Sequence, residues 1–398
     1  MTNNHPSNTL ATETIKPVTT DDLARIIREA AEQKRTVIAV GGGTHLFTAG
    51  KQFDLAIDTT GLTDGFHHTP ADMTATVPAG MRLSHAQEKL SHNGQWIPLD
   101  PPDRGNATVG GVIAANRWGP RRHHYGTAKD WVIATTIVNG KGEIVRAGAN
   151  VVKNVSGYDL NKLYIGSRGT VGIITDLSFK LSPLPAVRST FRACYSTPEE
   201  ALTTAAVIRS APLEPESLLI TKGRWTTLKA KHWWLLVELA GSEEGVTAQK
   251  ETLSTTLEGS SANRWNEANN KDAAYYWETV RFGNGEASPL FGIAEISFPK
   301  SQAECLLALL IKSYPKLSLK LLPARGLAIV EIEEETDRSL FVNEITKIGG
   351  SIEFDCVEIN SPSHRWPVEP AGISLMKKLK TALDPSGIFA PGTYVGGI

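Results

Sequence analysis

The chain has 398 residues, of which 41% are hydrophobic and 21% charged, and its formal net charge is −1. This balance is typical of a globular protein of two or three domains. A net charge near zero provides no basic field for nucleic acid. The three widely spaced cysteines argue against zinc or iron–sulfur sites held by this chain alone, and they favour a reducing cytoplasm.

The first twenty residues are polar, so we expect no signal peptide and a disordered segment over residues 1–14. Thr19, followed three residues later by Asp22, predicts the start of a helix that continues to about residue 35. Apolar segments at 36–40 and 54–58 predict two strands on either side of a triple glycine. The longest apolar run, 305–311, is too short to span a bilayer, so membrane attachment would require a partner.

Further along the chain, residues 73–80 predict a strand and residues 82–94 a helix that ends at a glycine. Residues 131–148 predict a β-hairpin that turns at Asn139-Gly140-Lys141-Gly142. A strand that ends at Pro183 and Pro185 indicates a domain boundary. The following residues, to about 365, are rich in tryptophan and predict a second α+β unit, and an amphipathic helix follows near the C-terminus.

The triple glycine Gly41–Gly43 excludes two common nucleotide motifs by its spacing. A P-loop that ended at Lys51 would need a glycine where His45 stands, and a Rossmann fingerprint would need its third glycine where Leu46 stands. Two readings remain open: a nest of backbone N–H groups that binds an anion, or a plain tight turn.

A second glycine-rich stretch, Gly105–Gly126, favours the anion-binding reading. Glycines and small residues occur where an apolar helix begins, which would let the segment lie against a large flat ligand. The two glycine stretches are about sixty residues apart and together suit a long cofactor with an internal pyrophosphate. FAD is the natural candidate.

The segments "GPRRHHYGTAKDWV" and "VVKNVSGYDLNKLYIGSRGTVGIIT" carry a family resemblance. With the two glycine stretches, they resemble the FAD-binding module of the vanillyl-alcohol-oxidase/PCMH flavoprotein superfamily, and more narrowly the FAD-binding E subunit of bacterial glycolate oxidase. The resemblance covers residues 15–185 and returns weakly in "LKTALDPSGIFAPG".

The resemblance implies an α+β fold. A PCMH-type FAD-binding domain would occupy residues 15–185, with subdomains at about 15–65 and 66–185. A smaller α+β cap domain would follow at 186–365, and the segment 366–398 would return to pack on the FAD domain.

The resemblance also implies the FAD contacts. The pyrophosphate would be held by backbone N–H groups of Gly41, Gly42, Gly43, Thr44, His45 and Leu46. The phosphates and flavin ring would be flanked by Pro101, Asn106, Thr108, Gly110, Gly111, Asn116 and Gly119. The rest of the cofactor would be lined by Tyr125, Gly126, Gly169, Val171 and Ile173. Lys153, Asn154 and Tyr158 match a stretch that we expect near the flavin, without an assigned role.

Some relatives attach FAD covalently through a histidine in the first loop. Thr44 stands at that position here and His45 is displaced by one, which would turn the His45 side chain away if the loop is extended. We therefore predict non-covalent FAD.

Other polar residues leave the chemistry open. Arg121 and Arg122 could bind a substrate carboxylate or an FAD phosphate, or they could form a solvated basic turn. The metal-binding cluster of His and acidic residues that larger catalytic relatives carry is not found, and His364 reads as part of a surface loop. The adjacent His123 and His124 should point apart, so we predict no metal site and name no catalytic residue.

We therefore expect an FAD-binding subunit of a glycolate oxidase (glycolate dehydrogenase) complex that converts glycolate to glyoxylate. Its partners would be a catalytic FAD subunit and an iron–sulfur subunit. Two alternatives stay open: a self-sufficient FAD-dependent 2-hydroxy-acid dehydrogenase, and a non-redox assembly subunit.

Overall fold

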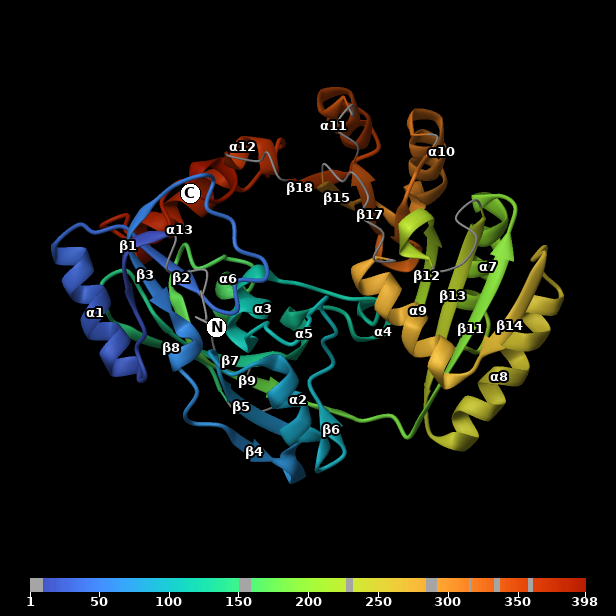
Figure 1. Cartoon of the computed structure of the whole chain (residues 1–398), viewed down its shortest axis with the longest axis horizontal. Coiled ribbons are helices and arrows are strands. Elements are labelled where there is room, and N and C mark those ends of the chain that lie inside the picture. The colour runs from blue at the N-terminus through green and yellow to red at the C-terminus, as the bar shows by residue number, and fades with distance from the viewer. Residues whose placement is uncertain are drawn as a thin grey trace, which may run out of the picture.

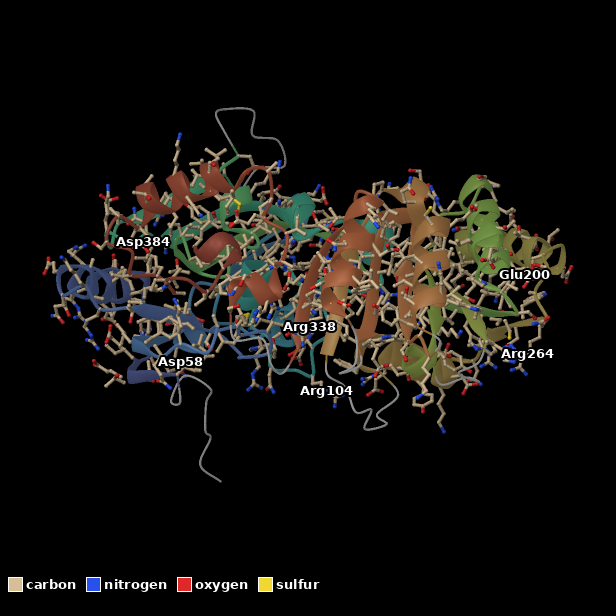
Figure 2. The ribbon with its side chains drawn as sticks, turned by 90° about the horizontal axis from the view of Figure 1, so that it is seen from above. Asp58, Arg104, Glu200, Arg264, Arg338 and Asp384 are labelled. Carbon is tan, nitrogen blue, oxygen red and sulfur yellow. The ribbon has the colours of Figure 1, made fainter. Side chains whose placement is uncertain are left out.

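The computed structural model describes residues 10–149, 159–226, 232–283, 292–314, 316–332, 337–356 and 361–398. In Figure 1, the N-terminal sheets and the C-terminal segment lie on one side, and the last large sheet lies on the other with its helices. Figure 2 shows the same elongated arrangement from above, with Asp58 and Asp384 toward one end and Glu200 and Arg264 toward the other.

The first sheet is parallel and has the strand order β1 (Ala11–Ile15), β3 (Phe53–Asp58), β2 (Val37–Val40). Helix α1 (Thr20–Glu32) joins β1 to β2 and begins where the Thr19 hydroxyl accepts a hydrogen bond from the N–H of Asp22 at 3.1 Å. Strand β1 corrects the expectation of disorder for residues 11–14. Its polar sequence can form a strand because the pairing with β3 uses backbone groups, which polar side chains do not prevent.

The second sheet is antiparallel and follows the order β4 (His67–Thr69), β5 (Thr74–Pro78), β9 (Ile173–Lys180), β7 (Val132–Val138), β8 (Ile144–Gly148). The predicted hairpin is confirmed as β7 and β8. The elements around this sheet are α2 (Leu83–Ser91), β6 (Gln95–Trp96), α3 (Val109–Ala115), α4 (Arg122–Tyr125), α5 (Ala128–Trp131), α6 (Asn161–Tyr164) and β10 (Ser182–Pro183).

The third sheet is antiparallel and contains eight strands. Their order is β14 (Arg264–Ala268), β11 (Val187–Tyr195), β13 (Trp233–Gly241), β12 (Ser217–Lys222), β16 (Leu319–Leu322), β17 (Leu327–Ile332), β15 (Gly292–Ser297), β18 (Ser351–Cys356). Its helices are α7 (Pro198–Ser210), α8 (Glu243–Glu258), α9 (Asn270–Phe282), α10 (Ala303–Ser313) and α11 (Arg338–Lys347).

The two faces of this sheet pack differently. Helices α7, α8, α10 and α11 share one large apolar core with the first face. On the other face, Leu219 and Leu236 pack with Trp277 of α9, and Trp118 from the N-terminal half joins this smaller cluster. The second face therefore looks toward the FAD-domain region predicted from the sequence.

The C-terminal segment contains α12 (Pro362–Arg365) and α13 (Ile373–Leu383), and then returns to the first sheet. The N–H of Val37 donates to the carbonyl of Ile388 at 2.8 Å, and the N–H of Ala390 donates to the carbonyl of Val37 at 2.7 Å. The end of the chain is thus hydrogen-bonded to β2, just before the triple glycine. Within the described ranges, the helices are all too short or too polar to cross a bilayer.

Candidate functional site

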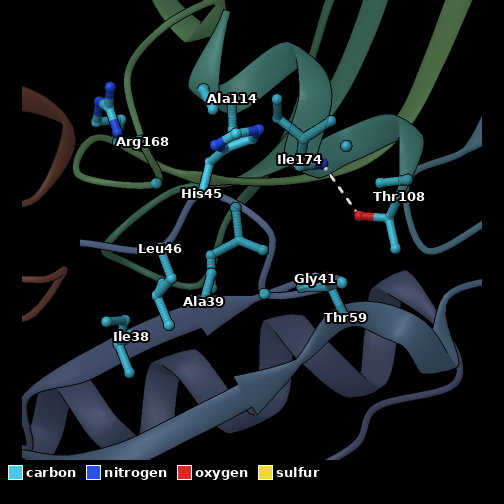
Figure 3. A pocket seen from close by; sticks show the side chains of 18 of the residues that line it. Ile38, Ala39, Gly41, His45, Leu46, Thr59, Thr108, Ala114, Arg168 and Ile174 are labelled. Atoms are coloured by element: carbon cyan, nitrogen blue, oxygen red, sulfur yellow. Dashed lines mark hydrogen bonds between the residues drawn. The ribbon is translucent and has the colours of Figure 1, made fainter. Parts of the chain in front are cut away.

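A cavity of about 920 Å³ lies where four segments meet. It is bordered by the loop after β2, the start of α3, the loop before β9 and residues 390–393 (Figure 3).

Close packing between the two glycine stretches shapes this cavity. A Cβ on Gly42 would overlap the backbone carbonyl of Asn106, and a Cβ on Gly41 would overlap the Thr108 hydroxyl. Gly110 lies similarly against Ala79, where a Cβ would come within 2.7 Å of the alanine Cβ. The glycines are therefore needed for backbone segments to approach each other, which explains why they occur as clusters in the sequence.

The first loop presents hydrogen-bond donors. The backbone N–H groups of Gly42, Gly43, Thr44 and His45 have no acceptor among the described residues. Gly43 adopts a left-handed φ of 68°, which lets successive N–H groups converge. Because backbone donors are nearly always paired in folded proteins, this set indicates an anionic ligand such as a phosphate.

The His45 side chain also lines the cavity, and Figure 3 shows its ring beside Ala114. Its Nε2 atom is buried and has no hydrogen-bond partner among the described residues. Burial, and then the positive charge of Arg117, lower the pKa of His45 to about 4, so the ring is neutral at pH 7. The expected outward orientation assumed an extended loop, but the chain turns at residues 44–45.

Eleven of the residues expected to bind FAD line this cavity. They are Gly41, Gly42, Gly43, Thr44, His45, Leu46, Thr108, Gly110, Gly111, Gly169 and Ile173. The sequence did not single out Ile38, Ala39, Thr59, Ala79, Arg168, Ala390 and Thr393, which line it too. Most of these are small or apolar residues of strands and turns, which carry no sequence signal that separates them from ordinary core positions.

The remaining predicted residues lie elsewhere. Asn116 and Val171 line a second cavity, and Pro101 and Arg121 line a surface cleft near α2. Asn106, Gly119, Tyr125, Gly126 and Arg122 line none of these three hollows. For all nine, contact with FAD or substrate stays a prediction. Lys153, Asn154 and Tyr158 lie outside the described residues.

The second cavity, of about 1130 Å³, adjoins the first, since Ala115 and Arg168 line both. Its walls come from the end of α3, from strands β15 and β18 of the eight-stranded sheet, and from α13. Arg168 pairs with Glu353 of β18 at 2.6 Å, and Arg365 of α12 pairs with the same carboxylate at 2.8 Å. These ion pairs tie the cofactor side of the molecule to the eight-stranded sheet.

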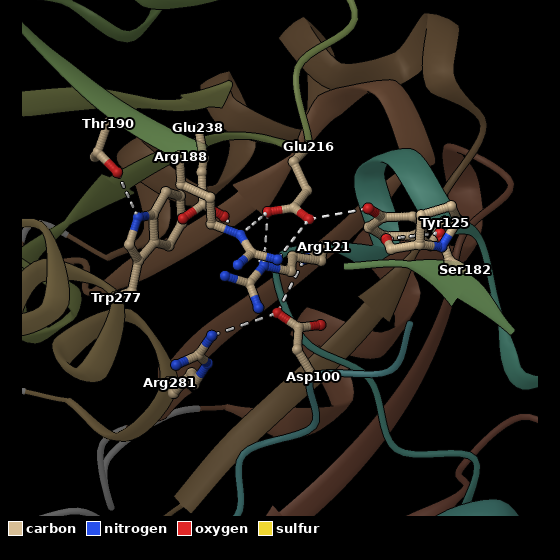
Figure 4. Close-up of polar contacts among 11 residues, drawn as sticks. Asp100, Arg121, Tyr125, Ser182, Arg188, Thr190, Glu216, Glu238, Trp277 and Arg281 are labelled. Atoms are coloured by element: carbon tan, nitrogen blue, oxygen red, sulfur yellow. Dashed lines mark hydrogen bonds and ion pairs between the residues drawn. The ribbon is translucent and has the colours of Figure 1, made fainter. Parts of the chain in front are cut away.

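Arg121 belongs to a buried polar network between the two halves (Figure 4). Its Nε lies 2.9 Å from Glu216 and 3.1 Å from Glu238, and its backbone N–H donates to Asp100 at 3.1 Å. The Tyr125 hydroxyl donates to Glu216 at 3.0 Å. Both residues thus bind side chains of the eight-stranded sheet. Arg122 instead lies over the ring of Trp118, at 5.2 Å from its centroid.

The pKa values of the two glutamates in this network, Glu216 and Glu238, are shifted in opposite directions. Burial, reinforced by the charge of Glu216, raises the pKa of Glu238 to about 7. Burial also acts to raise the pKa of Glu216, but its hydrogen bonds from Arg188 and the charge of Arg121 outweigh burial and lower that pKa to about 2. At pH 7, Glu216 is ionised and Glu238 is poised near its midpoint.

Among the described residues, the histidines outside the first loop line neither of the two cavities. Burial, and then the charge of Arg325, lower the pKa of His123 to about 4, and the ring of His124 packs edge-on against Tyr125. His364 is exposed in α12. In the part of the chain that the structure describes, His, Cys, Asp and Glu side chains form no cluster of three that could hold a metal ion.

Two family models match the chain. The FAD binding domain matches residues 12–148, and the C-terminal domain of FAD linked oxidases matches residues 362–394. These two segments supply the first glycine loop, the start of α3 and residues 390–393, all of which border the first cavity. The unpaired donors of that cavity fit the pyrophosphate of FAD.

Curated relatives that match this chain include two subunits of glycolate oxidase. Glycolate oxidase subunit GlcD of Bacillus subtilis is 27% identical over 95% of this chain and 87% of its own length. Glycolate oxidase subunit GlcE of Escherichia coli is 30% identical over 57% of this chain and 62% of its own length. Other relatives, named D-lactate or D-2-hydroxyglutarate dehydrogenases, are matched over less than half of their own length.

A solved structure of alkyldihydroxyacetonephosphate synthase superposes with a TM-score of 0.73 at 17% sequence identity, over 95% of this chain and 75% of that one. At this identity the likeness concerns the fold alone, and it confirms the PCMH-type α+β architecture. With an FAD-binding domain at its N-terminal side and the C-terminal domain of FAD-linked oxidases at its end, this chain is an FAD-dependent oxidoreductase.

Proposed function

We propose that this chain is the FAD-binding subunit of a glycolate oxidase complex, in which FAD is bound non-covalently. It would support the oxidation of glycolate to glyoxylate beside a catalytic FAD subunit and an iron–sulfur subunit. The likeness to GlcE and GlcD supports the glycolate assignment. The observation that carries the FAD role is the set of backbone donors at residues 42–45 that have no acceptor among the described residues, at the edge of the first cavity.

The residues of the chain would bind and orient the cofactor. The N–H groups of Gly42, Gly43, Thr44 and His45 would hold the pyrophosphate, and the neutral His45 ring would offer Nε2 as a further hydrogen-bonding atom. FAD, when bound, supplies the acceptor for two electrons and a proton. Arg168, at the border of the two cavities, would place a positive charge between cofactor and substrate while Glu353 fixes its position.

A second candidate function has its own support. The second cavity adjoins the first within one chain, which is what a self-sufficient 2-hydroxy-acid dehydrogenase needs for its substrate. The relatives named D-lactate and D-2-hydroxyglutarate dehydrogenases agree with this candidate.

Anaerobic addition of glycolate to the purified FAD-loaded chain separates these candidates. A subunit that depends on its partners should leave the flavin absorbance near 450 nm almost unchanged until a catalytic subunit is added. Bleaching by glycolate or D-lactate alone would establish the self-sufficient dehydrogenase. A purified chain that takes up no FAD would overturn both.

A further inference from the structure

The side chain of Arg117, directly after α3, is an unusual feature of the second cavity. It is only 10% exposed, and its buried Nε has no hydrogen-bond partner among the described residues. Its nearest carboxylate is Glu295, at 3.6 Å, beyond hydrogen-bond distance. A buried N–H donor that is left unpaired is costly. Arg117 lines the second cavity, so a ligand there can reach it.

The charged groups around Arg117 give it no closer counter-charge among the described residues. Glu295 accepts a hydrogen bond from the indole N–H of Trp118 at 2.6 Å through Oε1, while its Oε2 lies 3.6 Å from Arg117. Lys320 is buried nearby, and burial followed by the charge of Arg117 lowers its pKa to about 7. By contrast, Arg168 and Arg365 share Glu353 at hydrogen-bonding distances. Among the described residues, Arg117 therefore has only the 3.6 Å contact with Glu295 as its ion pair, and a carboxylate ligand would supply a closer counter-charge.

Helix α13 contributes an apolar wall to the same cavity. Met376, Leu379 and Leu383 recur at helical spacing and all three line it. They are only half-buried, and α13 has no fully buried residue although it is amphipathic. Leu163 and Ile165 line the cavity as well. The cavity thus combines a buried cation with a stripe of apolar side chains that the described residues cover only in part.

We infer that the second cavity binds a carboxylate with an apolar chain, the carboxylate at Arg117 and the chain along Met376, Leu379 and Leu383. Glycolate would occupy only part of this space. The inference rests on the proposed function only in taking the bound acid to be the 2-hydroxy acid that is oxidised. Arg117 and α13 then determine which acids are accepted.

Calorimetric titration of the FAD-loaded chain with acetate, butanoate and hexanoate tests the site with acids that have no hydroxyl to oxidise. Each added methylene should tighten binding by up to about fourfold. Hexanamide, which has the same chain without the charge, should bind at least about tenfold more weakly than hexanoate. Equal binding of hexanamide and hexanoate would overturn the role of Arg117.

Substitutions of Arg117 and Leu379 test separately the proposed contacts with the carboxylate and with the apolar chain. Arg117→Met should lower the binding affinity for all three acids by about tenfold or more, and Arg117→Lys should lower it less. Arg117→Met removes an under-paired buried charge, so the ligand-free protein should unfold at an unchanged or higher temperature. Arg25→Met, at an exposed helical position, is the charge-matched control and should bind as wild type does.

Leu379→Asn should abolish the increase in binding affinity from acetate to hexanoate, and it should leave the affinity for acetate unchanged. Leu375→Asn, on the same helix but 62% exposed, should behave as wild type. Wild-type acid binding by Arg117→Met, or a wild-type chain-length gain in Leu379→Asn, contradicts the inference. Acid binding that depends on Arg117 without any flavin bleaching by hydroxy acids would leave the inference intact and count against the self-sufficient dehydrogenase alone.

Discussion

Gly42 lies so close to the backbone carbonyl of Asn106 that a side chain at position 42 would overlap it. This contact joins the two glycine stretches, which are far apart in the sequence, into one wall of the first cavity. The first loop therefore depends on the second for its position, and the donors at residues 42–45 depend on both.

Gly42→Ala should consequently weaken FAD binding. The added methyl group must displace a backbone carbonyl, at a cost of about 1–3 kcal/mol for overpacking. We expect a lower ratio of bound FAD to protein, measured by absorbance after gel filtration, and a lower thermal midpoint. Gly372→Ala is the matched control, since a Cβ there meets no atom within 4 Å, and it should retain wild-type FAD. Full FAD occupancy in Gly42→Ala would show that the loops can separate without loss.

Asp384 should stabilise the C-terminal return. Its buried carboxylate accepts hydrogen bonds from the N–H groups of Ile388 at 3.1 Å and Phe389 at 2.8 Å, and it pairs with Lys380 at 2.7 Å. Asp384→Asn removes the counter-charge of Lys380, which keeps only its carbonyl acceptors, and should lower the free energy of unfolding by about 3 kcal/mol or more, measured with urea.

The exposed pair of Lys347 and Glu344 supplies the control for Asp384. Glu344→Gln should cost less than about 1 kcal/mol, because exposed ion pairs contribute little. Equal effects of the two substitutions would show that the Asp384 contacts do not hold the C-terminal segment in place.

Local sequence signals predicted the parts of the fold that depend on neighbours in the chain. Thr19 begins α1 as a cap residue does, and Asn139-Gly140 closes the hairpin of β7 and β8. The glycines at 41–43 and 110–111, for which the resemblance implies contacts with FAD, line one cavity. Strand β1 was missed because an edge strand with a polar sequence gains its stability from a partner strand forty residues away.

The sequence could not show which charges meet across the two halves of the molecule. Arg117 and Arg121 are four residues apart in one basic segment, yet Arg121 is held by two glutamates and Arg117 is not. That difference depends on where Glu216 lies, just before β12, and on the places of Glu238 in β13 and Glu295 in β15, which no local pattern encodes. The same is true of His45, whose orientation follows from a turn rather than an extended loop.

Acid precipitation of the purified protein should release FAD into the supernatant. The resemblance places Thr44 at the position of the covalent histidine, and a threonine hydroxyl is a poor substitute for an imidazole nitrogen. Because His45 itself lines the cavity, the His45→Ala variant shows whether any retained flavin is attached through this residue. If the wild-type pellet keeps flavin and the His45→Ala pellet does not, His45 is the attachment site and the prediction is wrong.

Glu238 should make the stability of the protein depend on pH near neutrality. Its pKa is about 7 in the folded protein, mainly because of burial, and near 4.5 for an unperturbed glutamate. Between these values the folded state keeps a proton that the unfolded chain has released, so the free energy of unfolding should fall as pH rises from about 4.5 to 7. The lowered pKa of Glu216 acts only below pH 4.5 and does not contribute in this range.

Glu238→Gln removes this titration because an amide carries no acidic proton. We expect the free energy of unfolding of the wild type, minus that of Glu238→Gln, to fall by on the order of 1–3 kcal/mol between pH 5 and pH 8. Urea titrations at several pH values measure the difference, in which the other titrating groups largely cancel. The free energy of unfolding of the wild type, minus that of Glu344→Gln, should not change with pH over the same range. A difference that rises with pH would mean that ionised Glu238 stabilises the contact with Arg121, and that the two halves are held together by charge rather than by a shared proton.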